Sequence, residues 1–307
     1  MTTTTRIRTF AIGAVAASSL LALSACGGDS SSSASESASG SAAALPSVSA
    51  DAALAAAVPE AIKSTGKLQM GTDASYAPME FIDTDGSTII GADVDLGNAI
   101  AAKLGLQAEW ANSSFDSLIV GVTNGKFNAS MSSFTINPER EQQVNMVSYL
   151  NAGTAWAVAT GNPAGVNPDD ACGKTVGVQK ATVQVDDIEE RNAACTAAGK
   201  AAIDIQQFTQ QSDVTTALAS GKVDAMLADS PVIAYAITQT GKLEQVGDIY
   251  GSAPYGVVVP LAEKEFATTV QAAVQSMIDD GSYKQILTKW GLQDGAVTTS
   301  ELNPAVS

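Results

Sequence analysis

The chain has 307 residues, of which 32 are acidic and 16 are basic, and its formal net charge is −16. A chain this acidic is not expected to bind nucleic acid, because contacts to phosphate need a basic surface. It contains no histidine, which excludes Ser-His-Asp and Cys-His nucleophile systems and removes the commonest metal ligand, so neither a cofactor nor a metal site is expected.

The first 25 residues have the features of a secretory signal peptide. Arg6 and Arg8 precede the uncharged apolar stretch Phe10–Ala25, which is too short and too rich in Ala and Ser to span a membrane. The motif Leu-Ser-Ala-Cys at 23–26 resembles the bacterial lipobox, in which lipid is attached to the cysteine thiol. We therefore predict cleavage before Cys26 and lipidation of its thiol. The alternative is an ordinary signal peptide with Cys26 as a spare thiol.

Residues 26–58 are predicted to form a flexible tether. Ten of the 24 residues from 27 to 50 are serine, and almost none could enter a hydrophobic core. No later stretch approaches the ~20 consecutive apolar residues that a membrane-spanning helix needs. Removal of the signal peptide takes away two basic residues, so the mature net charge is 14 − 32 = −18. The mature protein is thus expected outside the cytoplasm, lipid-anchored to the cell membrane.

Short apolar runs and helix-like segments alternate after the tether. The helices are expected to end at Gly105 and Gly125, where a left-handed residue is favoured. Such alternation is typical of βαβ units in a mostly parallel sheet. The predicted strands are 68–71, 107–110 and 129–131, and the predicted helices are 94–104 and 115–123.

The same alternation restarts at Lys174. Ser230 and Pro231 open the last helix of this second part, with serine as the cap and proline at the first helical position. The predicted strands here are 175–178, 203–207 and 223–227, and the predicted helices are 182–198 and 212–219, with another beginning at 230.

Two extended segments are predicted to connect the two parts. Thr154–Ala159 lies between them, and Tyr255–Pro260 leads back to helices over 264–280 and 282–290 that belong to the first part. The predicted fold class is α/β, with two doubly wound sheets joined by a two-strand hinge. Lobe 1 would comprise 59–157 and 254–295, lobe 2 would comprise 158–253, and 296–307 would form a C-terminal tail.

Cys172 and Cys195 are the cysteines that remain after Cys26. Export to an oxidising compartment favours a disulfide between them. Two buried, unpaired thiols are the alternative, because the sequence does not give the Cα separation that decides between the two.

Five sequence segments in register carry a family resemblance. They are GTDASYAPMEF (71–81), IIGADVDLGNAIAAKLG (89–105), SSFDSLIVGVTNGKFNASMSSFTINPER (113–140), TVGVQKATVQ (175–184) and SGKVDAMLADSPVIAY (220–235). Together they resemble the polar amino-acid-binding family of bacterial extracellular substrate-binding proteins. The resemblance covers roughly residues 63–291 and implies a two-lobed, periplasmic-binding-protein-like fold of type II.

The resemblance also implies a clamp for the charged groups of a free amino acid. Arg140 matches the family arginine that binds the α-carboxylate, helped by donors near Ser132, Ser133 and Thr135. The alternative is a solvated arginine at the start of a short helix. Asp229 matches the family aspartate that binds the α-ammonium group, although it could instead cap the following helix.

The remaining predicted contacts lie around this clamp. Thr182 and the backbone N–H groups that open its helix suit an anionic carboxylate. Tyr76 and Phe115 match two aromatic positions that sandwich the ligand side chain, with a place in the core as the alternative. Asp73 either binds a side-chain nitrogen or caps its own loop, and Gln179 lies at the entry to the carboxylate site.

The charge of the bound side chain is left open by two residues. Asp73 favours a basic or amide side chain, whereas Lys180 favours an acidic one if it points inward. The class of ligand is therefore a polar amino acid, without a choice among basic, amide and acidic side chains.

The expected function is a substrate-binding lipoprotein without catalytic activity. By resemblance, it would capture a polar amino acid by lobe closure and deliver it, as a monomer, to the permease and ATPase subunits of an ABC importer. One alternative is a ligand-sensing lipoprotein without a transporter. Another is a dehydratase, an activity that the same fold carries in a few relatives.

Overall fold

The computed structural model describes residues 47–306. The predicted signal peptide, the lipidation site Cys26 and the tether as far as residue 46 lie outside them. Within the described part of the chain, no helix combines the length and apolar character needed to cross a bilayer.

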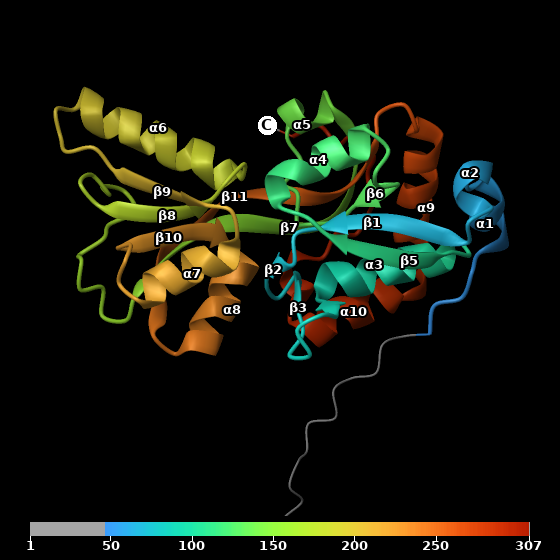
Figure 1. The fold of residues 1–307 in the computed structure, drawn as a ribbon, viewed down its shortest axis with the longest axis horizontal. Helices are drawn as coiled ribbons and strands as arrows, with labels where there is room; N and C mark the ends of the chain where they lie inside the picture. The colour runs from blue at the N-terminus through green and yellow to red at the C-terminus, as the bar shows by residue number, and fades with distance from the viewer. Residues whose placement is uncertain (1–46, 307) are drawn as a thin grey trace, which may run out of the picture. The chain divides into compact units, whose positions relative to one another are not determined.

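Eight strands form one hydrogen-bonded mixed sheet (Figure 1). Its order is β5 (Gln107–Asn112), β1 (Lys67–Thr72), β6 (Ala129–Ser130), β11 (Leu243–Pro260), β7 (Val144–Ala159), β10 (Ala225–Asp229), β8 (Thr175–Gln179) and β9 (Asp204–Phe208). Strands β5, β1 and β6 are parallel to one another, as are β10, β8 and β9. We call these two groups, with the helices that follow them, the first half and the second half.

The prediction of two separate sheets is corrected in one respect, although the α/β class is confirmed. Strands β7 and β11 have 16 and 18 residues and pair in antiparallel fashion along almost their whole length. The predicted hinge segments are parts of these long strands, so both halves share one sheet. The pairing is interrupted by register shifts between Val246 and Gly256, where the chain passes from one half to the other.

Helices cover both faces of the sheet (Figure 1). One face is covered by α4 (Phe115–Thr123) and α6 (Val183–Ala197), and each packs its apolar side chains into a separate buried cluster. The opposite face is covered by five helices that share one large core: α3 (Ala92–Lys103), α7 (Gln211–Ala219), α8 (Ser230–Thr240), α9 (Lys264–Asp280) and α10 (Ser282–Trp290). This core joins the two halves on that face.

Several short elements complete the fold. They are α1 (Ala52–Ala57), α2 (Glu60–Lys63), a hairpin-like sheet of β2 (Ser75–Tyr76), β3 (Glu80–Ile82) and β4 (Ile89–Ile90), α5 (Pro138–Glu141) and the 3-10 turn Gln293–Gly295. Helix α1 falls inside the segment predicted as tether, is capped by Asp51 and is followed by the buried Val58. The folded chain therefore begins before residue 59.

The C-terminal segment packs against the first half. Ser300 is buried, and Leu302 forms a β-bridge with Val147 of β7. Ser148 makes two more bonds to the segment, through its backbone N–H and its hydroxyl, both to Glu301. The predicted tail is thus fastened to one of the two central strands.

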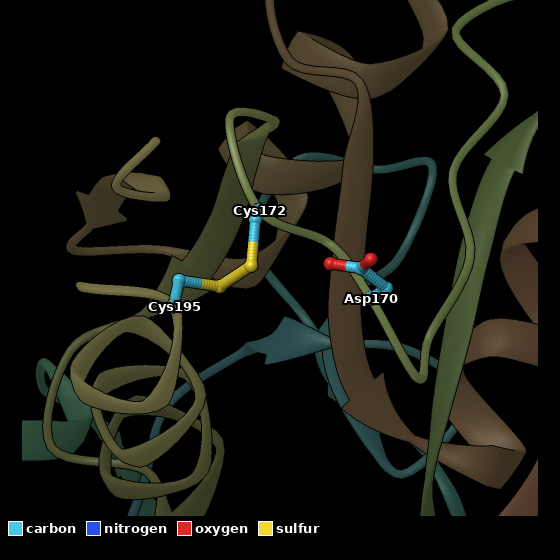
Figure 2. Close-up of side chains that lie close together, drawn as sticks. All are labelled: Asp170, Cys172 and Cys195. Atoms are coloured by element: carbon cyan, nitrogen blue, oxygen red, sulfur yellow. A yellow bond between two sulfur atoms is a disulfide. The ribbon is translucent and has the colours of Figure 1, made fainter. Parts of the chain in front are cut away.

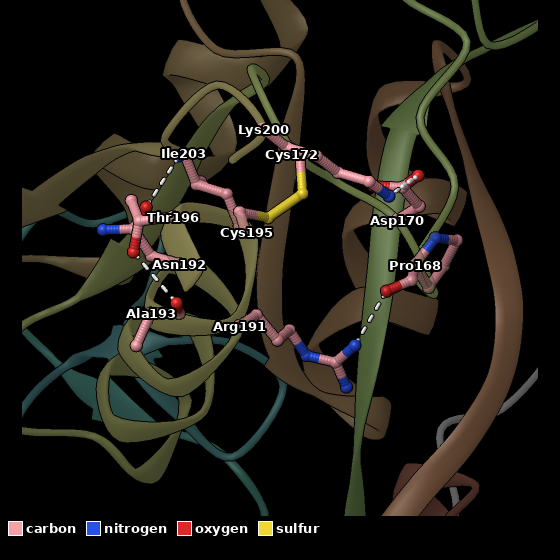
Figure 3. The surroundings of a disulfide bond; sticks show 10 residues. All are labelled: Pro168, Asp170, Cys172, Arg191, Asn192, Ala193, Cys195, Thr196, Lys200 and Ile203. Carbon is pink, nitrogen blue, oxygen red and sulfur yellow. Dashed lines mark hydrogen bonds and ion pairs between the residues drawn. A yellow bond between two sulfur atoms is a disulfide. The ribbon is translucent and has the colours of Figure 1, made fainter. Parts of the chain in front are cut away.

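A disulfide joins Cys172 and Cys195 in the second half, with a Cα–Cα distance of 5.6 Å. It ties the loop before β8 to the C-terminal part of α6 (Figure 3). Two polar contacts brace the same connection: Arg191 Nη1 donates to the carbonyl oxygen of Pro168 at 2.7 Å, and Lys200 pairs with Asp170 at 2.7 Å. Helix α6 is therefore held firmly at its C-terminal end.

Candidate ligand-binding site

One cavity between the two halves is lined by all ten residues predicted as ligand contacts. It lies at the carboxyl ends of β1, β6, β8 and β10, the edge at which ligands bind in open α/β sheets. The lining residues are Asp73, Tyr76, Phe115, Ser132, Ser133, Thr135, Arg140, Gln179, Thr182, Val183, Gln184 and Asp229. Their roles as ligand contacts stay a prediction.

Arg140 brings a buried cation to the first-half side of the cavity. Helix α5 carries it, and the Asn137 side chain caps this short helix by accepting from Arg140 N at 2.8 Å. The guanidinium donates to two backbone carbonyl oxygens, those of Thr135 at 2.7 Å and Ala181 at 3.1 Å. No carboxylate of the described residues lies within salt-bridge distance of it. Burial lowers the pKa of Arg140, and the charge of Asp229 opposes this shift.

Two aromatic rings lie near the same guanidinium. Its central carbon lies 5.4 Å from the Phe115 ring centre and 5.6 Å from the Phe134 ring centre. The two rings stack on each other with their centres 4.7 Å apart. Phe115 therefore lies at the cavity and in a core cluster at once, so the two interpretations of this aromatic are compatible.

Asp229 brings a buried anion to the second-half side. It is the last residue of β10 and the N-cap of α8, but its carboxylate makes no capping bond. Instead, Oδ2 accepts from the Tyr76 hydroxyl at 2.8 Å and Oδ1 accepts from Gln184 Nε2 at 2.8 Å. Burial raises the pKa of Asp229, while these two hydrogen bonds and the charge of Arg140 favour the ionised form. The capping alternative is thus not the one observed.

Gln184 was missed by the sequence reasoning. Its side-chain amide bridges Thr154 of β7, at 3.0 Å, and Asp229. A signal was present, because Gln184 lies in the first turn of the helix whose N-terminus was predicted to face the ligand. Val183 also lines the cavity and lies in the helix N-terminus whose backbone N–H groups were predicted to face the ligand.

The N-terminus of α6 opens onto the cavity. Thr182 is its N-cap and turns its hydroxyl back to the carbonyl oxygen of Gln179 at 2.8 Å. The N–H groups of Val183 and Gln184 are in the first turn, where a helix has no acceptor of its own. Ala181 holds a φ of 61°, a left-handed conformation, and Lys180 before it is exposed and does not line the cavity.

Asp73 lines the cavity and lies directly after β1. Its Oδ2 accepts from the backbone N–H of Phe115 at 2.9 Å and from Gln179 Nε2 at 2.9 Å. Burial raises the pKa of Asp73, and hydrogen bonds from Ser75, Phe115 and Gln179 oppose the shift. Asp73 thus holds the start of α4, a segment distant in sequence from its own loop.

Ser132 and Ser133 follow β6, and each is hydrogen-bonded to a fully buried carboxyl group. The Ser132 hydroxyl donates to Glu80 Oε1 at 3.0 Å and accepts from Asp73 N at 3.0 Å. Ser133, with a φ of 53°, donates its backbone N–H to Asp93 Oδ2 at 2.9 Å. These contacts fix where the two serines sit at the cavity wall.

Direct hydrogen bonds connect the two halves at the cavity and beside it. They are Tyr76 to Asp229, Arg140 to Ala181, Gln179 to Asp73, and Gln211 N to Ser75 Oγ at 3.1 Å. The free space that remains is about 10 Å³, which is room for roughly one water molecule. An amino acid can therefore enter only if the two halves move apart.

A second group of side chains has the spacing of metal ligands, in the second half (Figure 2). It consists of Asp170, Cys172 and Cys195. The two sulfur atoms are bonded to each other and so are not thiolates, and Asp170 is paired with Lys200. This group therefore has none of the chemistry of a zinc site and belongs to the structural bracing described above.

Comparison with known proteins identifies the family. Residues 68–293, well over half of the chain, match the model of the bacterial extracellular solute-binding proteins, family 3. The chain belongs to this family. It is accordingly an extracytoplasmic binding protein rather than an enzyme.

Three relatives show how close this likeness is. The arginine-binding protein ArgT of Corynebacterium glutamicum is 38% identical over 250 residues, which are 81% of this chain and 82% of the relative. The structure of an ancestral arginine-binding protein bound to arginine has a TM-score of 0.68 and 32% identity, covering 73% of this chain and 98% of the other. An ancestral arginine-binding protein bound to glutamine has a TM-score of 0.67 and 32% identity, covering 73% and 97%.

Proposed function

We propose that this protein captures free arginine outside the cytoplasm and delivers it to an ABC importer. The observation that carries the proposal is a pair of buried opposite charges in one cavity, Arg140 from one half and Asp229 from the other. Neither has a counter-ion within 4.0 Å among the described residues. A free amino acid carries the complementary pair, because its α-carboxylate suits a guanidinium and its α-ammonium suits a carboxylate.

The α-carboxylate would lie between Arg140 and the first turn of α6. Two kinds of donor converge there: the planar guanidinium, with N–H groups to spare beyond its two carbonyl contacts, and the backbone N–H groups of Val183 and Gln184. The α-ammonium group would then replace Tyr76 or Gln184 as a donor to Asp229.

The side chain is assigned from Asp73 and Lys180. Asp73 is a buried acceptor in the cavity wall, whereas Lys180 is exposed and does not line the cavity. The acidic-ligand alternative therefore loses the residue that favoured it. A guanidinium is the side-chain group best suited to a buried carboxylate, because it can form two parallel hydrogen bonds. Relatives named for arginine binding support this choice.

Glutamine is the second candidate ligand, on the strength of one contact. Gln179 already donates its side-chain amide to Asp73 at 2.9 Å, so this carboxylate accepts an amide as a partner. The ancestral arginine-binding protein with bound glutamine supports the same possibility.

Capture would occur by closure of the two halves about β7 and β11. A ligand that contacts Arg140 from one half and Asp229 from the other binds the closed state far better than the open one, and so shifts the population toward closure. The interrupted pairing between 246 and 256 is the natural place for the bend. Lobes with the boundaries predicted from the sequence would then move as units.

Delivery would rely on a lipid anchor at Cys26 and on permease and ATPase subunits of an importer. The lipobox-like motif and the Ser-rich segment after it support the anchor, and family membership supports the importer. Replacement of Cys26 by Ser should move the protein from the membrane fraction to the medium. Retention of the variant in the membrane fraction would contradict the anchor.

Ligand identity is tested by calorimetric titration of a fragment spanning residues 47–307 with the twenty amino acids. We expect arginine to bind most tightly, and Asp73→Asn to weaken arginine binding while leaving glutamine binding within a few fold. Asp116→Asn is the matched control, because it removes the same charge from an exposed residue nearby that does not line the cavity. Tightest binding of an acidic amino acid would contradict the proposal.

A further inference from the structure

Two fully buried carboxyl groups, those of Glu80 and Asp93, contact serines of the cavity wall. Glu80 begins β3, and Asp93 is the second residue of α3. The backbone N–H of Asp93 donates to the carbonyl oxygen of Met79 at 2.9 Å, which brings the two residues together. Both have 0% of their surface exposed. Neither lines the cavity, so ligand binding as proposed above does not use them directly.

The hydrogen bonds of this pair leave one oxygen over on each residue. Glu80 Oε1 accepts from the Ser132 hydroxyl, and Asp93 Oδ2 accepts from the Tyr149 hydroxyl at 2.8 Å and from Ser133 N at 2.9 Å. Glu80 Oε2 and Asp93 Oδ1 are buried and have no donor among the described residues. A proton shared between the two carboxyl groups would supply both oxygens with a hydrogen bond.

The surroundings decide which residue carries the proton. Asp93 accepts from Tyr149 and from Ser133, and donors of this kind stabilise an anion. Glu80 accepts from Ser132 alone and faces the negative charges of Asp93 and Asp73. The titratable groups around Glu80 are Asp93 from α3, Asp73 after β1, Tyr76 from β2 and Tyr149 from β7.

The electrostatics agree with this geometry. Burial raises the pKa of Glu80 well above its usual value, and the charge of Asp93 raises it further. Burial raises the pKa of Asp93 to about 6, while bonds from Tyr149 and Ser133 hold it down. Near neutral pH, the pair therefore has one proton and one negative charge.

We propose that Glu80 is a protonated positioning residue that donates to Asp93 and thereby holds Ser132 and Ser133 at the cavity wall. The link is direct on both sides, because Ser132 donates to Glu80 and Ser133 donates to Asp93. Ser133 is kept in its left-handed conformation by that bond. That these serines then serve the ligand carboxylate rests on the proposed function.

Infrared spectroscopy tests the proton without any ligand. The protein at pH 7.5 should show the carbonyl stretching band of a protonated carboxylic acid, and Glu80→Gln should lose it. Glu109→Gln is the matched control, because it adds the same amide at an exposed strand residue and should keep the band. Absence of the band, or its persistence in Glu80→Gln, overturns the proposal.

Binding then tests the positioning role. Glu80→Ala should weaken arginine binding about tenfold, because Ser132 and Asp93 lose their partner. Glu80→Gln should recover binding to within about threefold of the natural protein, because an amide donates to Asp93 and accepts from Ser132 as a protonated carboxyl does. Equal losses in both variants overturn the positioning role. If the natural protein binds no arginine, the proposed ligand fails while the infrared band still decides the proton.

Discussion

The two halves of the cavity each present one buried charge, but they surround it differently. Arg140 in the first half has only backbone carbonyls as partners, whereas both carboxylate oxygens of Asp229 in the second half already accept a side-chain donor. A ligand carboxylate would thus supply Arg140 with a counter-ion that the fold does not, while a ligand ammonium would compete with donors in place at Asp229. The first half should contribute more to affinity.

The largest expected effect is that of Arg140→Ala, which should weaken arginine binding by about 4 kcal/mol, or roughly a thousandfold in Kd. The free protein should keep its melting temperature, because the change removes a buried charge without a counter-ion. Arg191→Ala is the control: this arginine is paired with Asp187 and does not line the cavity, so its loss should leave Kd unchanged. A large fall in the melting temperature of the free Arg140→Ala protein would assign Arg140 a structural role.

The next effect concerns the stability of the second half. Replacement of both Cys172 and Cys195 by Ser opens a loop with a sequence separation of 23, which should cost about 3 kcal/mol in unfolding free energy. Denaturant titration measures the loss, and hydrogen exchange locates it. Faster exchange should appear in α6 and β8, with β1 and β5 unchanged; a uniform increase would show that the two halves unfold as one unit.

The third effect is that of Asp229→Asn, which tests the second half of the cavity and should lower affinity less than Arg140→Ala. We expect a loss of about 2 kcal/mol in arginine binding, or roughly thirtyfold in Kd, because the amide keeps the shape but cannot act as a full counter-ion. Calorimetry on this variant and on Arg140→Ala gives the ratio of the two affinity losses directly. A greater loss for Asp229→Asn would reverse the order of the two halves.

The smallest effect is a pH dependence confined to the first half. The pKa of Glu80 is raised in the fold, so its contribution to stability is complete below the unfolded pKa and falls as pH rises toward the folded one. The Glu80→Gln protein lacks this pH-dependent contribution to stability. Its unfolding free energy relative to the natural protein should therefore increase between about pH 4.5 and 5.5, by at most about 1.4 kcal/mol over that one pH unit. A flat difference across this range would mean that Glu80 ionises normally.

Most of the regular elements follow from patterns that are local in the sequence. The predicted helices over 94–104, 115–123 and 264–280 match α3, α4 and α9 closely, because periodicity and terminal glycines define them without reference to other segments. The ten predicted site residues share one cavity for a related reason. They follow strands or begin helices, and the parallel order of the sheet brings those ends together.

The missed features depend on contacts between distant segments. The first part of β11 was not predicted, because its exposed, glycine-containing stretch resembles a loop until it pairs with β7. The orientation of Lys180 was likewise open, since it depends on the left-handed turn at Ala181. Glu80 belongs to β3 and Asp93 to α3, and no local sequence pattern predicts that these two elements are in contact.

The hydrogen bond from Gln211 N to Ser75 Oγ joins the two halves but involves no residue that lines the cavity. It therefore acts on the closure equilibrium. Apparent affinity equals intrinsic affinity reduced by the fraction of molecules in the binding-competent state. Evolution or design can thus tune the working concentration range of the receptor at Ser75, together with the surroundings of Asp73, to which the Ser75 hydroxyl also bonds.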